Sequence, residues 1–253
     1  MTDPFEAWVN AVESRQLTDL QFSEVARALR ALSATYVQKR SSIGRGAALS
    51  GHGKRAAFAL FFAPLHYLLI RHIVNALQPA RARSPQLIVD LGCGTGAGGA
   101  AWAIAGRPMP KVFGIDRHPW ALREAGATYR AFGIRSRTIQ GDVSTAEWPR
   151  KDAGFLAAFV ANELDADSRH QLLDRLLERA RAGCPVLVVE PLAGFVAPWW
   201  PEWQKRFEAD GGRADEWRFH PAHVPAIVAK LDRAAGLDHR ELTGRSLWLK
   251  GAQ

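Results

Sequence analysis

A short apolar run followed by glycines at every second position stands where a cofactor could bind. Residues 87–91 read Leu-Ile-Val-Asp-Leu, and Gly92, Gly94 and Gly96 follow them. The run is typical of a buried parallel strand, and residues 97–105 favour a helix directly after the turn. Alternating glycines let the backbone turn sharply and approach a bound nucleotide, while the free N–H groups that begin the helix would face it. The pattern predicts a strand, a glycine turn and a helix that form a cofactor site.

The glycines alone leave the identity of the cofactor open. Gly94, Gly96 and Gly99 also fit the Gly-x-Gly-x-x-Gly pattern of dinucleotide-binding folds. The carboxylate of Asp90, which precedes the turn, suits a cationic ligand and is unfavourable beside a pyrophosphate. S-adenosylmethionine carries an ammonium and a sulfonium group, so we predict it as the cofactor. Cys93, inside the turn, completes this part of the predicted site.

Two more acids follow the next two predicted strands. The strand Lys111–Ile115 leads to Asp116, which lies 20 residues beyond Gly96, where a doubly wound fold places a carboxylate on the ribose hydroxyls of a nucleotide. The strand Arg137–Gln140 leads through a glycine to Asp142. We assign both acids to the cofactor site together with two neighbours, Arg117 and Val143.

An acid after each of the first three strands, together with the glycine turn, resembles the class I S-adenosylmethionine-dependent methyltransferases. Their first motif is an acid, one residue and then Gly-x-Gly-x-Gly, which residues 90–96 match. In that family an acid after the third strand accepts the adenine amino group and an apolar neighbour packs the ring, which implies these roles for Asp142 and Val143. The resemblance covers residues 87–250 and implies an α/β fold with a Rossmann-like sheet, mostly parallel, and an antiparallel C-terminal strand.

Polar residues also follow the fourth and fifth predicted strands. The strand Phe155–Val160 leads to Asn162 and Glu163, and the strand Pro185–Val189 ends at Glu190. Ligands of open α/β sheets bind beyond the carboxyl ends of the strands, so we expect these three side chains to face the transferred methyl group. Methyl transfer is an in-line displacement that mainly requires alignment, and we name Asn162 and Glu163 as the candidate catalytic residues. A helix cap is the alternative role for Asn162.

Residues 191–223 are rich in tryptophan and phenylalanine. Such a segment could stack on a flat substrate, or it could be part of the core. An alternative function follows from the first possibility: methylation of a small aromatic metabolite, with this segment as a lid and His220 or His223 as the base. After a predicted helix, residues 237–242 and 245–250 suit the antiparallel pair that closes the sheet.

Positive charge is concentrated before the first strand of the sheet. The chain has 33 Lys and Arg against 25 Asp and Glu, yet no acid lies between Glu24 and Asp90. Ten basic residues lie there: Arg27, Arg30, Lys39, Arg40, Arg45, Lys54, Arg55, Arg71, Arg81 and Arg83. This segment is either a solvated basic face or the binding surface of a polyanion such as RNA, for which we name as candidate contacts Arg40, Arg45, Lys54 and Arg55.

The same segment has the apolar periodicity of helices. Two amphipathic helices are predicted within residues 5–40, and a third over 54–77 with a bend at Pro64. A glycine-rich loop at 41–53 separates them. We therefore expect a helical, basic N-terminal module at residues 1–85 and a methyltransferase domain at 86–253.

Short motifs also resemble a family of ribosomal small-subunit methyltransferase-like proteins related to a mitochondrial ribosome assembly factor. Members carry Leu-Ser-x-x-Tyr in a helical N-terminal region, Asn-Glu-Leu after the fourth strand and Val-Glu-Pro at the fifth, which stand here at residues 32–36, 162–164 and 189–191. The resemblance implies ribosomal RNA as the substrate. Methyl transfer to RNA is therefore the main functional prediction, and a domain that binds the cofactor without turnover is a further alternative.

The cysteine content and the apolar stretches exclude other classes. Cys93 and Cys184 are too few for a disulfide framework, which indicates a reducing, cytoplasmic setting, and no His/Cys spacing fits a structural zinc. The first residues lack the features of a signal peptide. The most apolar stretch, residues 56–70, is shorter than the roughly 20 residues that cross a bilayer, so we expect a core helix and no membrane span.

Overall fold

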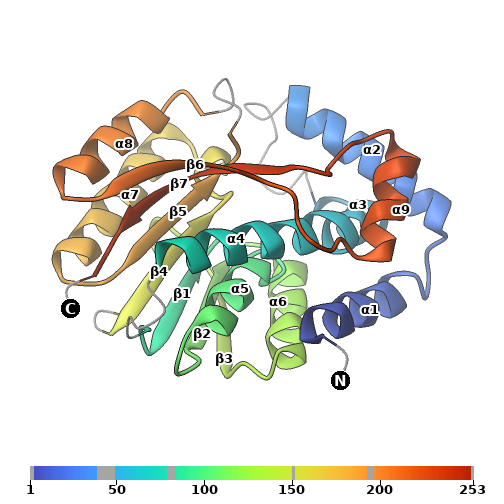
Figure 1. The fold of residues 1–253 in the computed structure, drawn as a ribbon, viewed down its shortest axis with the longest axis horizontal. Coiled ribbons are helices and arrows are strands. Elements are labelled where there is room, and N and C mark those ends of the chain that lie inside the picture. Colours follow the sequence, from blue (N-terminus) through green and yellow to red (C-terminus); the bar gives the residue numbers. More distant parts are fainter. Residues whose placement is uncertain (1–2, 39–48, 79–83, 150–151, 193–196, 252–253) are drawn as a thin grey trace.

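One seven-stranded sheet organises the chain (Figure 1). The computed structural model describes residues 3–38, 49–78, 84–149, 152–192 and 197–251. The strand order is β3-β2-β1-β4-β5-β7-β6. The strands are β1 (Leu87–Leu91), β2 (Lys111–Asp116), β3 (Ser136–Gln140), β4 (Ala153–Ala158), β5 (Val186–Glu190), β6 (Arg213–Phe219) and β7 (Leu242–Leu249).

The central strand β1 pairs in parallel with β2 on one side and β4 on the other, so that Asp90 aligns with Gly114 and Leu156. From β1 the chain builds outward to β3, and from β4 it builds in the opposite direction to β5. The order of strands therefore reverses beside β1, and the crevice at the carboxyl ends of β1 and β4 is where such a sheet binds its ligand. The Rossmann-like prediction is confirmed.

The antiparallel closure of the sheet uses a different strand from the one predicted. β7 is antiparallel to both β5 and β6, whereas the expected hairpin around Thr243 and Gly244 is wrong because both residues lie inside β7. Gly244 marks a close approach instead of a turn, since a Cβ there would lie 2.9 Å from Leu69 Cδ2. The true partner, β6, is a charged edge strand in which no residue is buried, a composition that protects an edge from further pairing but resembles a loop in sequence.

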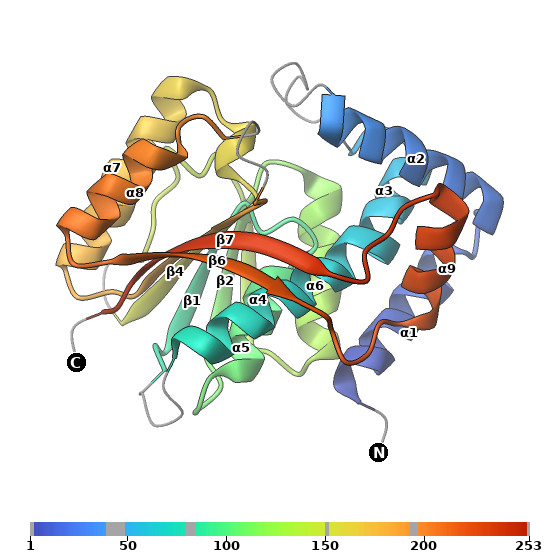
Figure 2. The same cartoon turned by 45° about the horizontal axis from the view of Figure 1, so that its top comes forward.

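Helices cover both faces of the sheet (Figures 1 and 2). α4, α5 and α6 lie on one face and α7 and α8 on the other, while α1, α2, α3 and α9 gather at one end. The helices are α1 (Pro4–Gln16), α2 (Phe22–Gln38), α3 (His52–Ala57), α4 (Ala63–Leu77), α5 (Ala97–Ala105), α6 (Pro119–Ala131), α7 (Ala166–Arg181), α8 (Trp200–Ala209) and α9 (Ala226–Ala235).

The N-terminal helices share a hydrophobic core with the helices of the sheet. The ring of Tyr67 in α4 stacks between Phe5 of α1 and Phe132 at the end of α6, with ring centres 4.8 and 5.1 Å apart. The indole N–H of Trp8 donates to the Thr128 hydroxyl at 3.1 Å in the same buried layer. The predicted N-terminal module is thereby packed directly against the sheet's helical face.

The predicted third helix runs from His52 to Leu77 and contains one turn of π-helix, η3 (Phe58–Phe62). The distortion precedes Pro64, where we expected a bend, and the Ala63 N–H bonds to the carbonyl five residues back, at Phe58. The helix is long and apolar enough to cross a membrane, but 67% of its most apolar window is buried inside the protein. It is a core helix, as predicted.

Candidate functional site

The glycine turn after β1 has the conformation that its sequence requires. Gly92, Gly94 and Gly96 have φ angles of 67°, 51° and 80°, a region that side-chain-bearing residues rarely adopt. A Cβ on Gly92 would overlap Val160, 2.8 Å from its Cβ, and one on Gly96 would lie 2.9 Å from the Cα of Ala125. The turn is therefore wedged between the loop after β4 and helix α6, and α5 begins immediately after it, as predicted.

Asp90, near the end of β1, makes hydrogen bonds to the two helices that flank this turn. Its side chain is buried, and Oδ2 accepts from the Gly99 N–H at 2.9 Å and the Tyr129 hydroxyl at 3.1 Å. Burial raises the pKa of Asp90 to about 7, although both hydrogen bonds favour the charged form. The carboxylate thus connects α5 to α6. Its membership of the cofactor site stays a prediction, and its role there would be to support the turn.

Cys93 takes part in the turn through its backbone. Its N–H donates to the Ile115 carbonyl at 2.9 Å, and its carbonyl accepts from Gly96 at 2.7 Å. The thiol is buried against β2, where a Cβ on Gly114 would lie 2.9 Å from the sulfur. Burial raises the pKa of the Cys93 thiol well above its ordinary value, so this cysteine is a packed neutral group.

The acid after β2 connects the second strand to the glycine turn. Asp116 Oδ2 accepts from the Gly94 N–H and Oδ1 from the His118 N–H, both at 2.8 Å. A carboxylate has about four lone-pair positions, so each oxygen can accept one more hydrogen bond. The carboxylate and the turn are therefore already assembled as a single unit at the carboxyl end of the sheet.

The acid after β3 forms an ion pair with Arg117, and its second oxygen accepts from Ser144 N at 2.9 Å and Ser144 Oγ at 2.7 Å. Burial alone would raise the pKa of Asp142, but the bonds from Ser144 and Arg117 hold it below its ordinary value. Val143 beside it is buried. The structure thus brings Asp116, Arg117, Asp142 and the turn to one edge of the sheet.

Arg175 of α7 holds the loop that carries Asp142, and no sequence pattern indicates this role. Its guanidinium carbon lies 3.7 Å from the ring centre of Trp148. The same group donates to the carbonyls of Val143 at 3.1 Å and Ser144 at 2.6 Å. A stacked guanidinium with several backbone acceptors is a rigid clamp, because its planar fork loses little freedom when it binds.

Asn162 lies in η4 (Ala161–Glu163), a 3-10 helix of three residues, and is oriented by two partners. Its Nδ2 donates to Glu190 Oε2 at 2.6 Å, and its Oδ1 accepts from the indole N–H of Trp199 at 2.9 Å. The helix cap is a different residue, Asp165, which accepts from the Ser168 N–H at 2.8 Å. The capping alternative for Asn162 is therefore wrong.

Glu190 has a different role from the one expected. It is fully buried, and Oε1 accepts from the Ala161 N–H at 3.0 Å while Oε2 accepts from Asn162. It positions the turn after β4 instead of facing the acceptor. Glu163, by contrast, is exposed on that turn.

Four aromatic side chains, which sequence reasoning missed, form a cluster that reaches the turn after β1 through Phe58. Phe58 and Phe62 belong to η3, His66 follows in α4, and Phe159 comes directly after β4. Phe58 lies over the turn, since a Cβ on Gly94 would be 3.8 Å from its ring. A π-helical turn next to a functional site is a recurring feature of proteins, but the sequence has no local pattern that predicts it.

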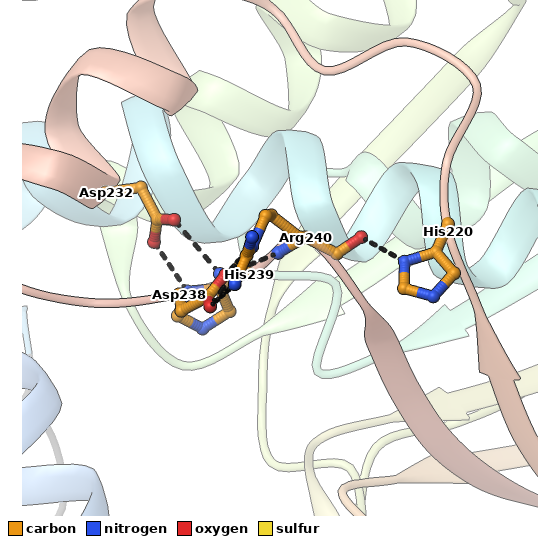
Figure 3. Close-up of polar contacts among 5 residues, drawn as sticks. All are labelled: His220, Asp232, Asp238, His239 and Arg240. Atoms are coloured by element: carbon orange, nitrogen blue, oxygen red, sulfur yellow. Dashed lines mark hydrogen bonds and ion pairs between the residues drawn. The ribbon is translucent and has the colours of Figure 1, made fainter.

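The two histidines of the alternative function lie in other contacts. Nδ1 of His220 lies 3.1 Å from the Arg240 carbonyl oxygen, in the polar cluster of Figure 3, and Nε2 of His223 lies 2.7 Å from Glu6 Oε1 of α1. Both contacts join the segment after β6 to its neighbours. Within the part of the chain that the structure describes, neither ring bonds to the glycine turn or to η4.

The aromatic segment 191–223 contributes mainly to the core. Trp199, Trp200 and Trp203 are buried, and the ring centres of Trp199 and Trp203 are 4.6 Å apart. Arg245 of β7 lies over Trp200, with the guanidinium carbon 4.2 Å from the ring centre. These tryptophans fill the space between α8 and the sheet, so a lid is not their role.

Of the predicted RNA contacts, Arg40 and Arg45 lie outside the described residues. Lys54 and Arg55 lie in the first turns of α3 and are half-buried. Arg55 Nε donates to the Leu49 carbonyl at 2.9 Å, and its guanidinium carbon lies 5.9 Å from the ring centre of Trp120. Arg55 therefore has contacts within the protein, and its contact with RNA stays a prediction.

These residues fit S-adenosylmethionine. Gly94 carries no Cβ, and one there would meet only the Phe58 ring at 3.8 Å, so a nucleoside can approach the main chain at this position. Asp116 has acceptor capacity for ribose hydroxyls, and Asp142 with Val143 offers an acid and an apolar side chain one strand further, as an adenine would need. Among the described residues, no group of His, Cys, Asp and Glu side chains could hold a metal ion.

Comparisons with known proteins agree. Residues 88–183 match the family model of the methyltransferase domain. No curated protein matches the chain. A solved protein of Nostoc punctiforme, assigned as an O-methyltransferase, is 17% identical over 90% of this chain and 69% of its own, with a TM-score of 0.55.

Two further solved structures share the fold. NcsB1, an O-methyltransferase of neocarzinostatin biosynthesis in complex with S-adenosylmethionine, is 16% identical over 96% of this chain and 74% of its own, with a TM-score of 0.50. The plantazolicin methyltransferase BpumL is 11% identical over 95% and 99%, with a TM-score of 0.52. Residues 88–183 are therefore a methyltransferase domain, and the sheet has the fold of class I S-adenosylmethionine-dependent methyltransferases.

Proposed function

We propose that the protein transfers the methyl group of S-adenosylmethionine to RNA, with ribosomal RNA as the favoured substrate. The observation that carries the proposal is the place of the basic helices α2 and α3 beside the site. They pack closely, since a Cβ on Gly53 would lie 3.2 Å from the Cβ of Ala28. Lys54 and Arg55 of α3 stand one helical turn before Phe58, whose ring lies next to the glycine turn.

The charges on this surface are available to a polyanion. Arg27 and Arg30 of α2 are exposed, and no ion pair joins either of them to an acid within the described ranges. Lys54 and Arg55 follow on α3. Phosphate contacts by such groups supply much of the affinity for a nucleic acid, independently of its sequence.

The residues after β4 and β5 supply alignment for the transfer. Bound S-adenosylmethionine presents a methyl group on a sulfonium: the acceptor's lone pair forms the new bond to carbon, and the pair of the broken C–S bond stays on sulfur. Asn162, oriented by Glu190 and Trp199, positions the acceptor for this in-line attack. We assign to Glu163 the acceptance of a proton from an acceptor that must lose one.

Methylation of a small aromatic molecule is the second candidate. The half-buried rings of Phe58, Phe62, His66 and Phe159 favour it, because a flat molecule could stack on them. Its proposed base, His220 or His223, has no described contact with the site, which weakens this form of the alternative. We place the enzyme in the cytoplasm because Cys93 and Cys184 are free, buried thiols.

The test offers the protein S-adenosylmethionine with a tritiated methyl group, total RNA and a metabolite extract in parallel. We expect label in RNA, and binding of RNA that weakens with salt by a log–log slope of roughly 0.7 to 0.9 for each phosphate contact. The variant Arg27→Glu/Arg30→Glu should bind RNA at least tenfold more weakly with unchanged affinity for S-adenosylmethionine. A matched reversal at exposed positions elsewhere, Lys111→Glu/Lys205→Glu, should leave RNA binding intact. Label only in small molecules would refute the proposal.

A further inference from the structure

The four rings beside the glycine turn form one aromatic cluster. His66 stacks on Phe159 with ring centres 3.9 Å apart and planes 19° from parallel. Phe58 and Phe62 lie 6.0 and 6.1 Å from the His66 ring centre, and 6.0 Å from each other. The cluster therefore joins η3 and the start of α4 to the carboxyl end of β4.

The backbone departs from regular geometry on both sides of this cluster. Phe58 and Phe62 belong to a π-helical turn, and Phe159 has a φ of 59°, a conformation unfavourable for a bulky residue. The Phe159 N–H is nevertheless bonded to the Val189 carbonyl at 2.8 Å, which fixes the ring where β4 ends. Such departures persist where the surrounding structure imposes them, and they concentrate at functional sites.

Core packing alone accounts poorly for these rings. Phe61, in the same π-helical turn, is fully buried, whereas Phe58, Phe62, His66 and Phe159 are all half-buried. Phe58 lies next to the turn at Gly94, and Phe159 directly follows β4, three residues before Asn162, so the cluster connects the predicted cofactor turn with the predicted catalytic residue.

We infer that this cluster, Phe58, Phe62, His66 and Phe159, is the acceptor site, and that it receives a planar nucleobase of single-stranded RNA. Every base has a π-face, so ring stacking holds it without reading the sequence, and RNA that is read by proteins is largely unpaired. The inference rests on the proposed function, because the basic helices would hold the phosphates while the cluster holds the base.

The chain offers a matched control for the stack. His72 of the same helix stacks on Phe219 with ring centres 3.9 Å apart and planes 5° from parallel, beside β6 and away from the glycine turn. Leucine at residue 66 or at residue 72 removes one imidazole from an equivalent pair. His66→Leu should raise KM for RNA by roughly ten- to a hundredfold, the range expected for one stacked base, whereas His72→Leu should leave KM unchanged.

A second variant separates binding from stability. Phe159→Gly removes the ring and also relieves the unfavourable φ, so we expect an unchanged or higher Tm together with the raised KM. Phe159→Tyr keeps the ring and should retain KM. In calorimetry, every variant should bind S-adenosylmethionine with the same affinity as the wild-type protein.

The fluorescence of 2-aminopurine placed in the RNA gives a readout besides turnover, because stacking quenches it. Quenching by the wild-type protein that is lost in His66→Leu and Phe159→Gly supports the inference. If RNA is methylated and both variants keep wild-type KM and quenching, the acceptor site is elsewhere and the proposed function stands. If the wild-type protein methylates no RNA, the proposed function fails, and this inference fails with it.

Discussion

Asn162 donates its side-chain amide to the fully buried carboxylate of Glu190 across 2.6 Å. Since Trp199 donates to the oxygen of the same amide, both ends of the Asn162 side chain are fixed. An aspartate could not replace it, because two carboxylates would then face each other. The type of residue at position 162 is thus dictated by an acid 28 residues later, at the end of β5.

Replacing Asn162 should affect turnover more than cofactor binding. We expect Asn162→Ala to lower kcat by about 10- to 100-fold, since loss of alignment reduces transition-state stabilisation, with little change in the Kd of S-adenosylmethionine. Asn162→Asp should also lower the free energy of unfolding, because it places like charges together. Steady-state kinetics, calorimetry and urea unfolding test this, with Asn75→Ala on the exposed side of α4 as control. Equal losses of kcat and cofactor affinity would assign Asn162 a purely structural role.

Strands β1, β2 and β5 were predictable because each is a short, mainly apolar run with an acid at or next to its end. β6 was not, since its charges serve an exposed edge and nothing in its own sequence distinguishes it from a loop. The same limit applied to Glu190. The sequence locates this residue at the end of the fifth strand. The orientation of its carboxylate toward Ala161 and Asn162, however, depends on the pairing of β4 with β5.

Asp116 should be needed for affinity. Asp116→Ala removes the predicted charge-assisted bonds to the ribose and the acceptor for the Gly94 N–H, together worth roughly 1.5–3 kcal/mol, or about one to two decades in Kd. Calorimetry with S-adenosylmethionine measures the loss. Asp19→Ala, which removes an exposed acid before α2, controls for the change in net charge. An unchanged Kd would limit Asp116 to supporting the turn.

The glycine turn allows a test of steric fit at constant backbone conformation. Gly92 and Gly133 both have a φ of 67°, but a Cβ on Gly133 meets no atom within 4 Å, whereas one on Gly92 overlaps Val160. Gly133→Ala should cost only the conformational strain, about 1–2 kcal/mol. Gly92→Ala should cost a further 1–3 kcal/mol and weaken cofactor binding.

Urea unfolding of both variants measures this difference. The double variant Gly92→Ala/Val160→Ala should recover part of the stability, because it removes the methyl groups nearest the new Cβ. Equal costs for the two single variants would mean that the turn can move away from Val160.

Arg175 and η3 show which parts of the site had no sequence signal. Arg175 lies in an ordinary amphipathic helix, and its acceptors are backbone carbonyls about 30 residues earlier. Every residue type has such a carbonyl, so the sequence does not reveal these bonds. The π-helical turn is defined by a backbone hydrogen bond from Ala63 to Phe58, five residues back, and no residue type is specific to such a bond. The glycines and acids were recognisable because the conformation and charge they provide belong to those residue types alone.

The last prediction concerns the pH dependence of stability. Burial raises the pKa of Asp90 to about 7 in the folded protein, from an ordinary value near 4 in the unfolded chain. Its contribution to stability is therefore fully present below about pH 4 and is lost as the pH rises toward 7, because the unfolded chain releases this proton first. Tyr129, Cys93 and Asp116 also surround the carboxyl group, and the charge of Asp116 adds to the raised pKa.

Asp90→Asn removes this ionisation and keeps an oxygen that can accept from the Gly99 N–H. We expect the free energy of unfolding of Asp90→Asn relative to wild type to increase between pH 5 and pH 8. The increase should be on the order of 3 kcal/mol, because the difference accumulates over about two pH units, up to the folded-state pKa of about 7. Urea unfolding of both proteins at several pH values measures it, and Asp19→Asn controls for loss of an exposed acid. Parallel stability curves for wild type and Asp90→Asn would show that Asp90 is ionised throughout, and the carboxylate would then act on a bound sulfonium as a full charge at neutral pH.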